Sequence, residues 1–164
     1  MLTNIGLREE ARLEVGQMLN LLLADEYVIY VTTRNYHWNV TGPAFYALHK
    51  QFEAQYEQIA EWIDQVAERT RAIGVRARGN WYDLASAARC TPDPTNDTPA
   101  EHMLSELLAL HEELIVQLRT DSSACAKKFN DAGTADFLTA LMEKHEKIAW
   151  MLRAQLENSD EASA

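Results

Sequence analysis

Apolar residues recur at steps of three and four along most of this chain, and this spacing limits the possible folds more than any other feature. Such steps place side chains on one face of an α-helix. The first of these segments runs from about Glu9 to Tyr36. Its stripe consists of Val15, Leu19, Leu22, Glu26, Ile29, Thr33 and His37. The pattern predicts a long helix that packs one face against a core.

The same reasoning predicts three more long helices. After a break at 41–43, apolar residues repeat every seven positions over roughly 30 residues, or about 45 Å of helix. The repeat consists of Phe45, Phe52, Ile59, Val66 and Ile73. A third helix begins at the capping box near Thr98 and Pro99 and ends at the turn residues 130–133. The fourth runs from Thr134 to about Glu157.

Residues 74–97 connect the second long helix to the third and are rich in turn-forming residues, with about two turns of helix expected at 81–88. The predicted fold class is therefore all-α: a four-helix bundle with a short extra helix in the long crossover between helices two and three. We expect one domain over residues 1–164, with short flexible ends at about 1–7 and 158–164.

The formal net charge of −10 narrows the choice of partners. A field of this sign repels DNA and anionic lipid and concentrates cations, although solubility alone is the simpler interpretation. The sequence shows neither a signal peptide nor an apolar stretch long enough for a membrane span. Cys90 and Cys125 form neither a metal-binding pair nor a disulfide framework. We therefore expect a cytoplasmic protein.

One face of the second helix combines imidazole with carboxylates. His49 and Glu53 are one turn apart, as are Asp64 and Glu68, and at 100° per residue all four fall within about 100° of one another. His37 ends the preceding helix, a short turn away. These ligand types suit iron and its neighbours, and no thiolate is offered that would favour a structural zinc site.

The two ends of this ligand face are too far apart to bind one metal ion within a single chain. His49 and Asp64 are separated by about 22 Å of straight helix. They can meet only if a second copy of the helix runs antiparallel across a two-fold axis. One subunit would then supply half of each site (His37, His49 and Glu53), and its partner the other half (Asp64 and Glu68).

Two alternatives to this shared site were considered. A solvated helix face with ordinary i, i+4 pairs explains the carboxylates as well, whereas two histidines at matching ends of a helical hairpin favour the metal site. A site inside one subunit, built from paired Glu-x-x-His motifs, fails because none of the five histidines has Glu three residues before it. His111 and His145 lie on apolar stripes and are expected to be core residues.

The chain resembles the Dps mini-ferritins from about residue 10 to residue 157. The block Tyr-His-Trp-Asn-Val-Thr-Gly at 36–42 carries the resemblance. It is followed by Phe45, Leu48, His49, Phe52, Glu53, Ile63, Asp64, Ala67, Glu68 and Arg69. The segments 135–138 and 146–152 extend it.

This resemblance implies a ferritin-like fold, a hollow dodecamer, and ferroxidase centres between two-fold-related subunits. Members of the family oxidise Fe(II), usually with hydrogen peroxide, and store ferric oxide, which removes both reactants that form hydroxyl radicals. Each shared site would hold at most two iron ions. The implied iron ligands are His37, His49, Glu53, Asp64 and Glu68. Iron affinity should fall at acidic pH as the two histidines become protonated.

Three details of the resemblance leave questions open. Family members more often have Asp at the position of Glu53, and the longer side chain changes the geometry with which it would bridge two iron ions. Trp38 would border the site as an electron donor, or pack at the dimer interface. Asp131 and Asp136 match a region that lines acidic pores, although a carboxylate in the first turn of a helix is favoured in any case.

Direct DNA binding, in a nucleoid protein with little redox role, is the alternative function. Relatives that bind DNA usually do so through a mobile tail rich in Lys and Arg. Here Arg8 is the only basic residue before the first helix, and the segment 158–164 is acidic. We therefore predict no direct DNA binding. A structural bundle without redox chemistry is a third interpretation, and the sequence leaves open whether zinc competes with iron.

Overall fold

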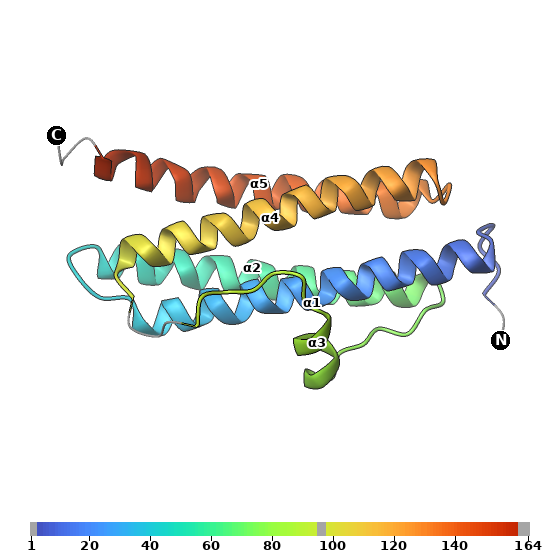
Figure 1. The fold of residues 1–164 in the computed structure, drawn as a ribbon, viewed down its shortest axis with the longest axis horizontal. Coiled ribbons are helices and arrows are strands. Elements are labelled where there is room, and N and C mark those ends of the chain that lie inside the picture. The colour runs from blue at the N-terminus through green and yellow to red at the C-terminus, as the bar shows by residue number, and fades with distance from the viewer. Residues whose placement is uncertain (1–2, 95–97, 161–164) are drawn as a thin grey trace.

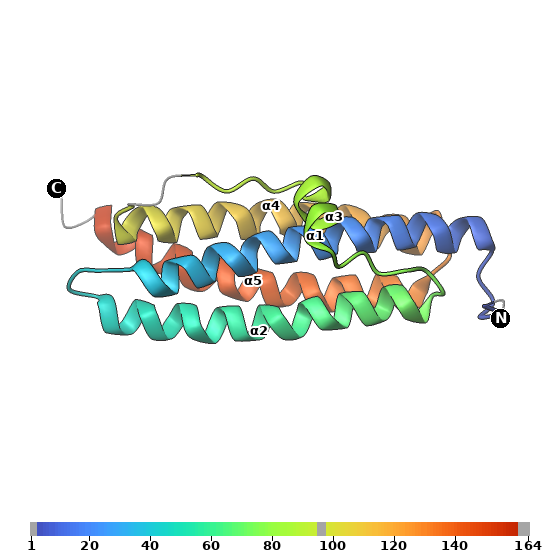
Figure 2. The ribbon, with the colours of Figure 1, turned by 90° about the horizontal axis from the view of Figure 1, so that it is seen from below.

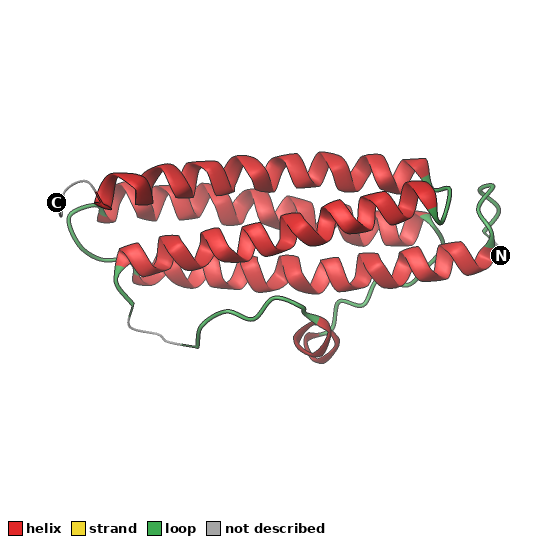
Figure 3. Ribbon diagram, turned by 45° about the horizontal axis from the view of Figure 1, so that its top comes forward, coloured by secondary structure: helices red, strands yellow, loops and turns green. Residues whose placement is uncertain are grey.

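The computed structural model describes residues 3–94 and 98–160, and within these ranges it contains helices and no strand (Figure 3). The helices are α1 (Glu9–Asn39), α2 (Phe45–Ala72), α3 (Trp81–Ala87), α4 (Ala100–Lys127) and α5 (Ala132–Asp160). The prediction of an all-α bundle with a short helix in the crossover is confirmed. Among the described helices, none is both long and apolar enough to cross a membrane.

The bundle consists of two antiparallel helical hairpins, α1 with α2 and α4 with α5 (Figures 1 and 2). The crossover runs back along the bundle, so that α2 and α4 point the same way (Figure 2). Between the hairpins, α1 packs against α4 more extensively than α2 packs against α5. The two hairpins are therefore less tightly joined along α2 and α5.

Aliphatic side chains from the four long helices fill the core. Ile29, Phe52, Leu107 and Leu141 are each 0–1% exposed. Burying one such side chain contributes about 1.5–3 kcal/mol. The apolar residues that repeat every seven positions along α2 are buried, except Phe45, which is 44% exposed at the start of the helix.

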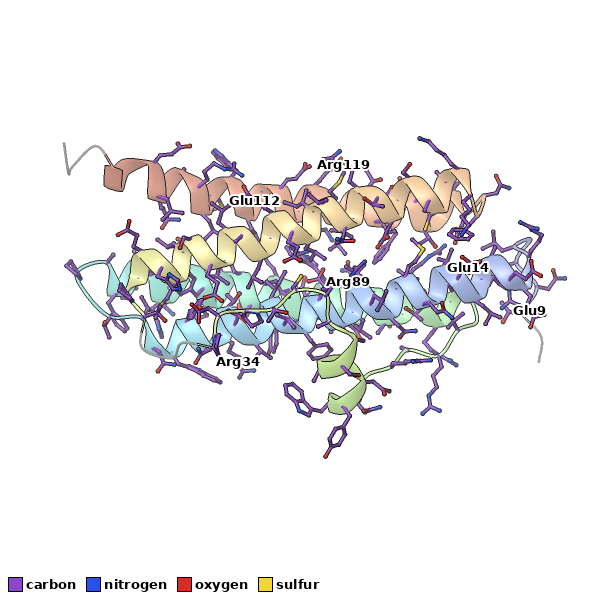
Figure 4. All side chains as sticks on the ribbon, in the orientation of Figure 1. Glu9, Glu14, Arg34, Arg89, Glu112 and Arg119 are labelled. Carbon is purple, nitrogen blue, oxygen red and sulfur yellow. The ribbon has the colours of Figure 1, made fainter. Side chains whose placement is uncertain are left out.

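Asp25 of α1 is fully buried and anchors the crossover to the bundle. One carboxylate oxygen accepts hydrogen bonds from the backbone N–H groups of Arg89 (2.6 Å) and Cys90 (3.2 Å). The other pairs with the Arg89 guanidinium at 2.7 Å. A buried carboxylate needs such partners to offset its loss of water. Figure 4 shows Arg89 where the crossover passes α1.

The start of α5 differs from the prediction. The helix begins at Ala132 rather than Thr134, so Gly133, predicted to end the preceding helix, lies in its first turn. The turn depends on Asn130, whose φ of 55° is in the left-handed region that Asn tolerates. Asp131 then accepts hydrogen bonds from the backbone N–H of Thr134 (2.9 Å) and from its hydroxyl (2.6 Å). This carboxylate caps the new helix.

The two aspartates considered as pore residues lie in different surroundings. Asp131 is 3% exposed and pairs with Arg69 of α2 at 3.2 Å, so capping and ion pairing account for it. Asp136 is exposed and, because α5 begins early, lies beyond the first turn, contrary to expectation. A role for Asp136 in a pore stays a prediction.

Other helix ends differ from the prediction by a few residues. α1 continues to Asn39, and α4 begins after Pro99 and ends at Lys127, before the predicted turn. α5 extends to Asp160, into the segment 158–164 for which a short flexible end is predicted, and that prediction stays untested. Residues 161–164 of the same predicted flexible end lie outside the described residues.

Candidate metal centre

His37 and His49 stack against each other beside the turn that joins α1 to α2. His37 lies in the last turn of α1, and His49 in the second turn of α2. Gly42 between them has a φ of 101°, a conformation that residues with a side chain rarely adopt. The ring centroids are 3.9 Å apart and the ring planes differ by 22°. The chain reversal thus brings the two imidazoles into contact.

Each of these imidazoles donates a hydrogen bond to the backbone of the other residue. Nδ1 of His37 lies 2.9 Å from the carbonyl oxygen of His49, and Nδ1 of His49 lies 2.8 Å from that of His37. A carbonyl oxygen only accepts hydrogen bonds, so both Nδ1 atoms carry the proton. In the neutral rings, Nε2 then has a free lone pair, which is the arrangement found in metal-binding histidines.

Glu53, one turn after His49, is held by Lys50. Its Oε2 lies 2.6 Å from Nζ of Lys50, and its side chain is 32% exposed. The hydrogen bond from Lys50 lowers the pKa of Glu53, and the charges of His37 and His49 act in the same direction. Glu53 therefore carries its charge at neutral pH, and Lys50 occupies one of its two carboxylate oxygens.

Asp64 and Glu68 are exposed on α2 and do not meet the histidine pair within one chain. Asp64 lies about 22 Å along the helix from His49. Across the described parts of the chain, no three His, Cys, Asp or Glu side chains are close enough to hold a metal ion. The single chain therefore presents two separate groups of candidate ligands.

Exposed aromatic side chains surround the histidine pair. Trp38 is 63% exposed and Tyr46 is 74% exposed, while the Phe45 ring lies 5.2 Å from the His49 ring. The guanidinium of Arg34, labelled in Figure 4, lies 5.3 Å from the Trp38 ring. Clusters of large exposed apolar side chains are typical of interfaces with another protein. Trp38 was predicted to border the site, whereas the exposed Tyr46 was not.

A second histidine pair is buried at the centre of the bundle. The Nδ1 atoms of His111 (α4) and His145 (α5) are 2.8 Å apart, and Nε2 of His145 lies 2.9 Å from Oε1 of Glu26 (α1). All three residues are 0% exposed. Burial and the neighbouring His145 lower the pKa of His111 well below its ordinary value. The prediction that both histidines are core residues is confirmed, whereas the pairing of Glu26 with His145 was not anticipated, although Glu26 was placed on the buried stripe.

Cys90 and Cys125 are both buried and unpaired. Burial raises the pKa of each thiol to about 12. The thiolate is the form of cysteine that binds metals and attacks electrophiles. Both cysteines therefore serve as small packing residues.

Comparisons with known proteins point to one family. The ferritin-like domain family matches residues 16–162. The chain is 34% identical to DNA protection during starvation protein 2 of Bacillus anthracis, over 87% of this chain and 97% of that protein. It is 44% identical to a low temperature-induced protein of Nostoc sp., over 94% of this chain and 86% of that protein.

Solved structures show the same fold. The Dps protein from Vibrio cholerae O1, described as a member of a broad superfamily of ferritin-like diiron-carboxylate proteins, superposes with a TM-score of 0.88. The two chains are 30% identical, and the match covers 95% of this chain and 98% of the other. The prediction of a ferritin-like bundle is confirmed.

Proposed function

Because this chain belongs to the Dps family of ferritin-like proteins, we propose that it stores iron and oxidises Fe(II) at sites shared between two subunits. Hydrogen peroxide is the proposed oxidant. Two Fe(II) ions each give one electron to one peroxide, whose O–O bond breaks, and the iron leaves as ferric oxide hydroxide with release of protons. The mineral would collect inside a hollow dodecamer. Consuming iron and peroxide together protects the cell from hydroxyl radicals.

The stacked pair of His37 and His49 is the observation that carries this proposal. Their backbone hydrogen bonds hold both rings in the Nδ1–H form, so both Nε2 lone pairs are available without a change of tautomer. Neutral imidazole nitrogen suits iron and its neighbours. The same backbone contacts also fix the ring orientations, which reduces the entropy lost when a metal ion binds.

A second subunit would supply Asp64 and Glu68. Both side chains are exposed on α2, and a hollow of about 310 Å³ beside Asp64 is lined largely by apolar residues. The exposed aromatic side chains around the histidine pair provide apolar surface for such a contact. An antiparallel pairing of two α2 helices would bring each histidine pair to the partner's carboxylates and form two equivalent sites.

The carboxylates would bind Fe(II) and stabilise Fe(III) more strongly, because they are hard, anionic ligands. Glu53 would bring a carboxylate of which one oxygen is paired with Lys50 at 2.6 Å. Its side chain is one methylene longer than the Asp more usual in the family, which changes how it would reach the iron.

Anaerobic Fe(II) addition followed by hydrogen peroxide tests this function, with ferric absorbance and particle size followed together. The His37→Ala/His49→Ala variant should oxidise iron at least tenfold more slowly than the parent protein, because it lacks both Nε2 donors. His102→Ala is the matched control, since His102 is exposed and distant in sequence from the proposed ligands. Equal rates for the double variant and the parent would show that the ligand assignment is wrong. Repeating the assay with oxygen in place of peroxide identifies the oxidant.

A further inference from the structure

A groove of about 680 Å³ runs between α2 and α5, where the two hairpins pack least extensively. Its lining includes Lys50, Gln51, Gln55 and Trp62 from α2, and Lys144 and Lys147 from α5. Three of these residues are lysines, and no Asp or Glu belongs to the lining within the described part of the chain. This is unusual in a protein with 25 acidic and 15 basic residues. Because Lys50 pairs with Glu53, the positive charge of the groove comes from Lys144 and Lys147 of α5.

Hydrogen-bond donors in this groove lack acceptors. Gln55 is 4% exposed, and neither its amide nitrogen nor its amide oxygen has a hydrogen-bond partner. The amide nitrogen of Gln51 is also buried without a partner. Leaving a buried polar group unpaired costs about 1–3 kcal/mol, so these amide groups favour a groove that is filled by water or by a polar ligand.

The two lysines on α5 are available to such a ligand. Lys144 contacts the amide oxygen of Gln65 at 3.3 Å and the ring of Trp62 at 5.6 Å, and both contacts are with uncharged groups. Neither Lys144 nor Lys147 pairs with a carboxylate among the described residues. Their charges are therefore not neutralised by a direct partner.

We propose that this groove binds a small oxyanion of the phosphate class. The ammonium groups of α5 and the buried amide donors of α2 would supply hydrogen bonds to its oxygen atoms. Hydrogen bonds between a charged donor and an anionic oxygen are stronger than neutral ones. The ligand would also accept hydrogen bonds from the unpaired amide nitrogens of Gln51 and Gln55 and join α2 to α5 where the bundle is least tightly packed.

A small anion fits this groove better than a nucleic acid does. Charges farther than about 8–10 Å are largely screened at physiological salt, so a single ion in the groove experiences mainly the nearby lysines. A DNA duplex would also approach the surrounding surface, which contributes to the net charge of −10. The unpaired amide of Gln55 is almost entirely buried, so only a small ligand can reach it.

The groove is separate from the candidate metal ligands. At 100° per residue around α2, Gln55 lies about 180° from Asp64 and about 140° from Glu68, so the groove opens on another face of the helix. A contact along the ligand face therefore need not cover it. Lys50, which lines the groove and pairs with Glu53, lies at the boundary of the two faces. A link to mineral growth rests on the proposed function: an oxyanion held here would offer oxygen ligands to Fe(III) beside the oxidation site.

Calorimetric titration of the metal-free, assembled protein with inorganic phosphate tests this proposal. The parent should bind phosphate saturably. The Lys144→Gln/Lys147→Gln variant should bind at least tenfold more weakly, because two cationic donors are lost. Gln55→Leu should also bind more weakly and still fold, since it removes a buried amide that has no partner. Lys127→Gln/Lys128→Gln is the matched control, because it removes the same charge from exposed positions at the end of α4 and should bind like the parent.

Two outcomes would overturn the proposal. One is that the parent does not bind phosphate saturably, or that the groove variants bind phosphate with the same affinity as the control variant. The other is duplex DNA binding by the parent that is lost in Lys144→Gln/Lys147→Gln while phosphate does not bind. Iron oxidation measured without phosphate on the same variants keeps the two proposals distinguishable. If a groove variant loses phosphate binding but oxidises iron normally, the result bears on the groove alone. If the parent binds phosphate but oxidises iron slowly, the result bears on the proposed metal site alone.

Discussion

The two histidine pairs show how hydrogen-bond partners decide what an imidazole does. In the pair of His37 and His49, each Nδ1 is used by a backbone carbonyl, and each Nε2 is left for an outside ligand. In the buried pair, Nδ1 atoms face each other, and Nε2 of His145 is used by Glu26. The first pair leaves two nitrogen donors open to an outside ligand, as the proposed metal site requires, whereas the second ties three helices together inside the core.

Stability of the bundle should decrease between pH 7 and pH 5 because of His111. Its folded-state pKa is well below 6.5, because the side chain is buried and lies beside His145, which in turn contacts Glu26 and the Trp62 ring. Below pH 6.5 the unfolded chain therefore binds a proton that the folded chain resists. Above pH 6.5, His111 is neutral in both the folded and the unfolded chain and costs no stability. Below pH 6.5, the free energy of unfolding decreases by up to about 1.4 kcal/mol per pH unit. Urea unfolding followed by circular dichroism measures this slope.

A His111→Gln variant separates this titration from the rest of the chain. Gln keeps a hydrogen-bonding group but does not titrate, so the slope between pH 7 and pH 5 should flatten. The exposed His102→Gln variant should keep the slope of the parent. An unchanged slope in His111→Gln would show that other groups cause the acid sensitivity.

At the scale of helices, the network at the start of α5 fixes its position relative to α2. Asp131 caps α5 through Thr134 and pairs with Arg69, which also donates to the Thr134 hydroxyl at 2.9 Å. Asp131→Ala should lower the free energy of unfolding by about 2–3 kcal/mol, because a cap is lost and Arg69 loses its ion partner. Thermal or urea unfolding checks this value.

Asp136→Ala is the control for this prediction, because it removes the same charge from an exposed position of the same helix. Its effect should stay within about 0.5 kcal/mol. If the two variants are equally stable, the contacts of Asp131 contribute nothing to the fold.

The periodicity of apolar residues predicted the long helices well, because every turn of a bundle helix must face the core. The start of α5 was missed, since Asp131 caps the helix from a segment whose composition is typical of a turn. The pairing of Lys50 with Glu53 was also missed, because helical spacing allows many such pairs and does not select one. Glu26, although placed on a buried stripe, gave no indication of its partner, since His145 is 119 residues away. The groove was missed for the same reason, as its sides come from α2 and α5.

At the scale of the whole molecule, net charge predicts the response to DNA. The chain carries −10, and an oligomer multiplies this repulsion of phosphate. A gel shift at low salt with metal-free protein should show no complex with duplex DNA, because phosphate contacts supply most non-specific affinity. A shifted band that disappears as salt increases would contradict this prediction and favour the nucleoid-binding function.

The central claim is that each oxidation site takes residues from two chains, and mixed assemblies test it directly. One parental variant is His37→Ala/His49→Ala, and the other is Asp64→Asn/Glu68→Gln. Each alone should lack fast iron oxidation. In a mixed dimer, the intact histidines of one chain meet the intact carboxylates of the other, so one of its two sites is complete.

Iron oxidation by the two variants, co-assembled in equal amounts, is the measurement. Random pairing makes half of the dimers mixed, so about a quarter of the sites and of the parent rate should return. Simple mixing of the separately assembled variants should restore nothing. If co-assembly also restores nothing while both chains fold and assemble, the site does not join these residues across two subunits.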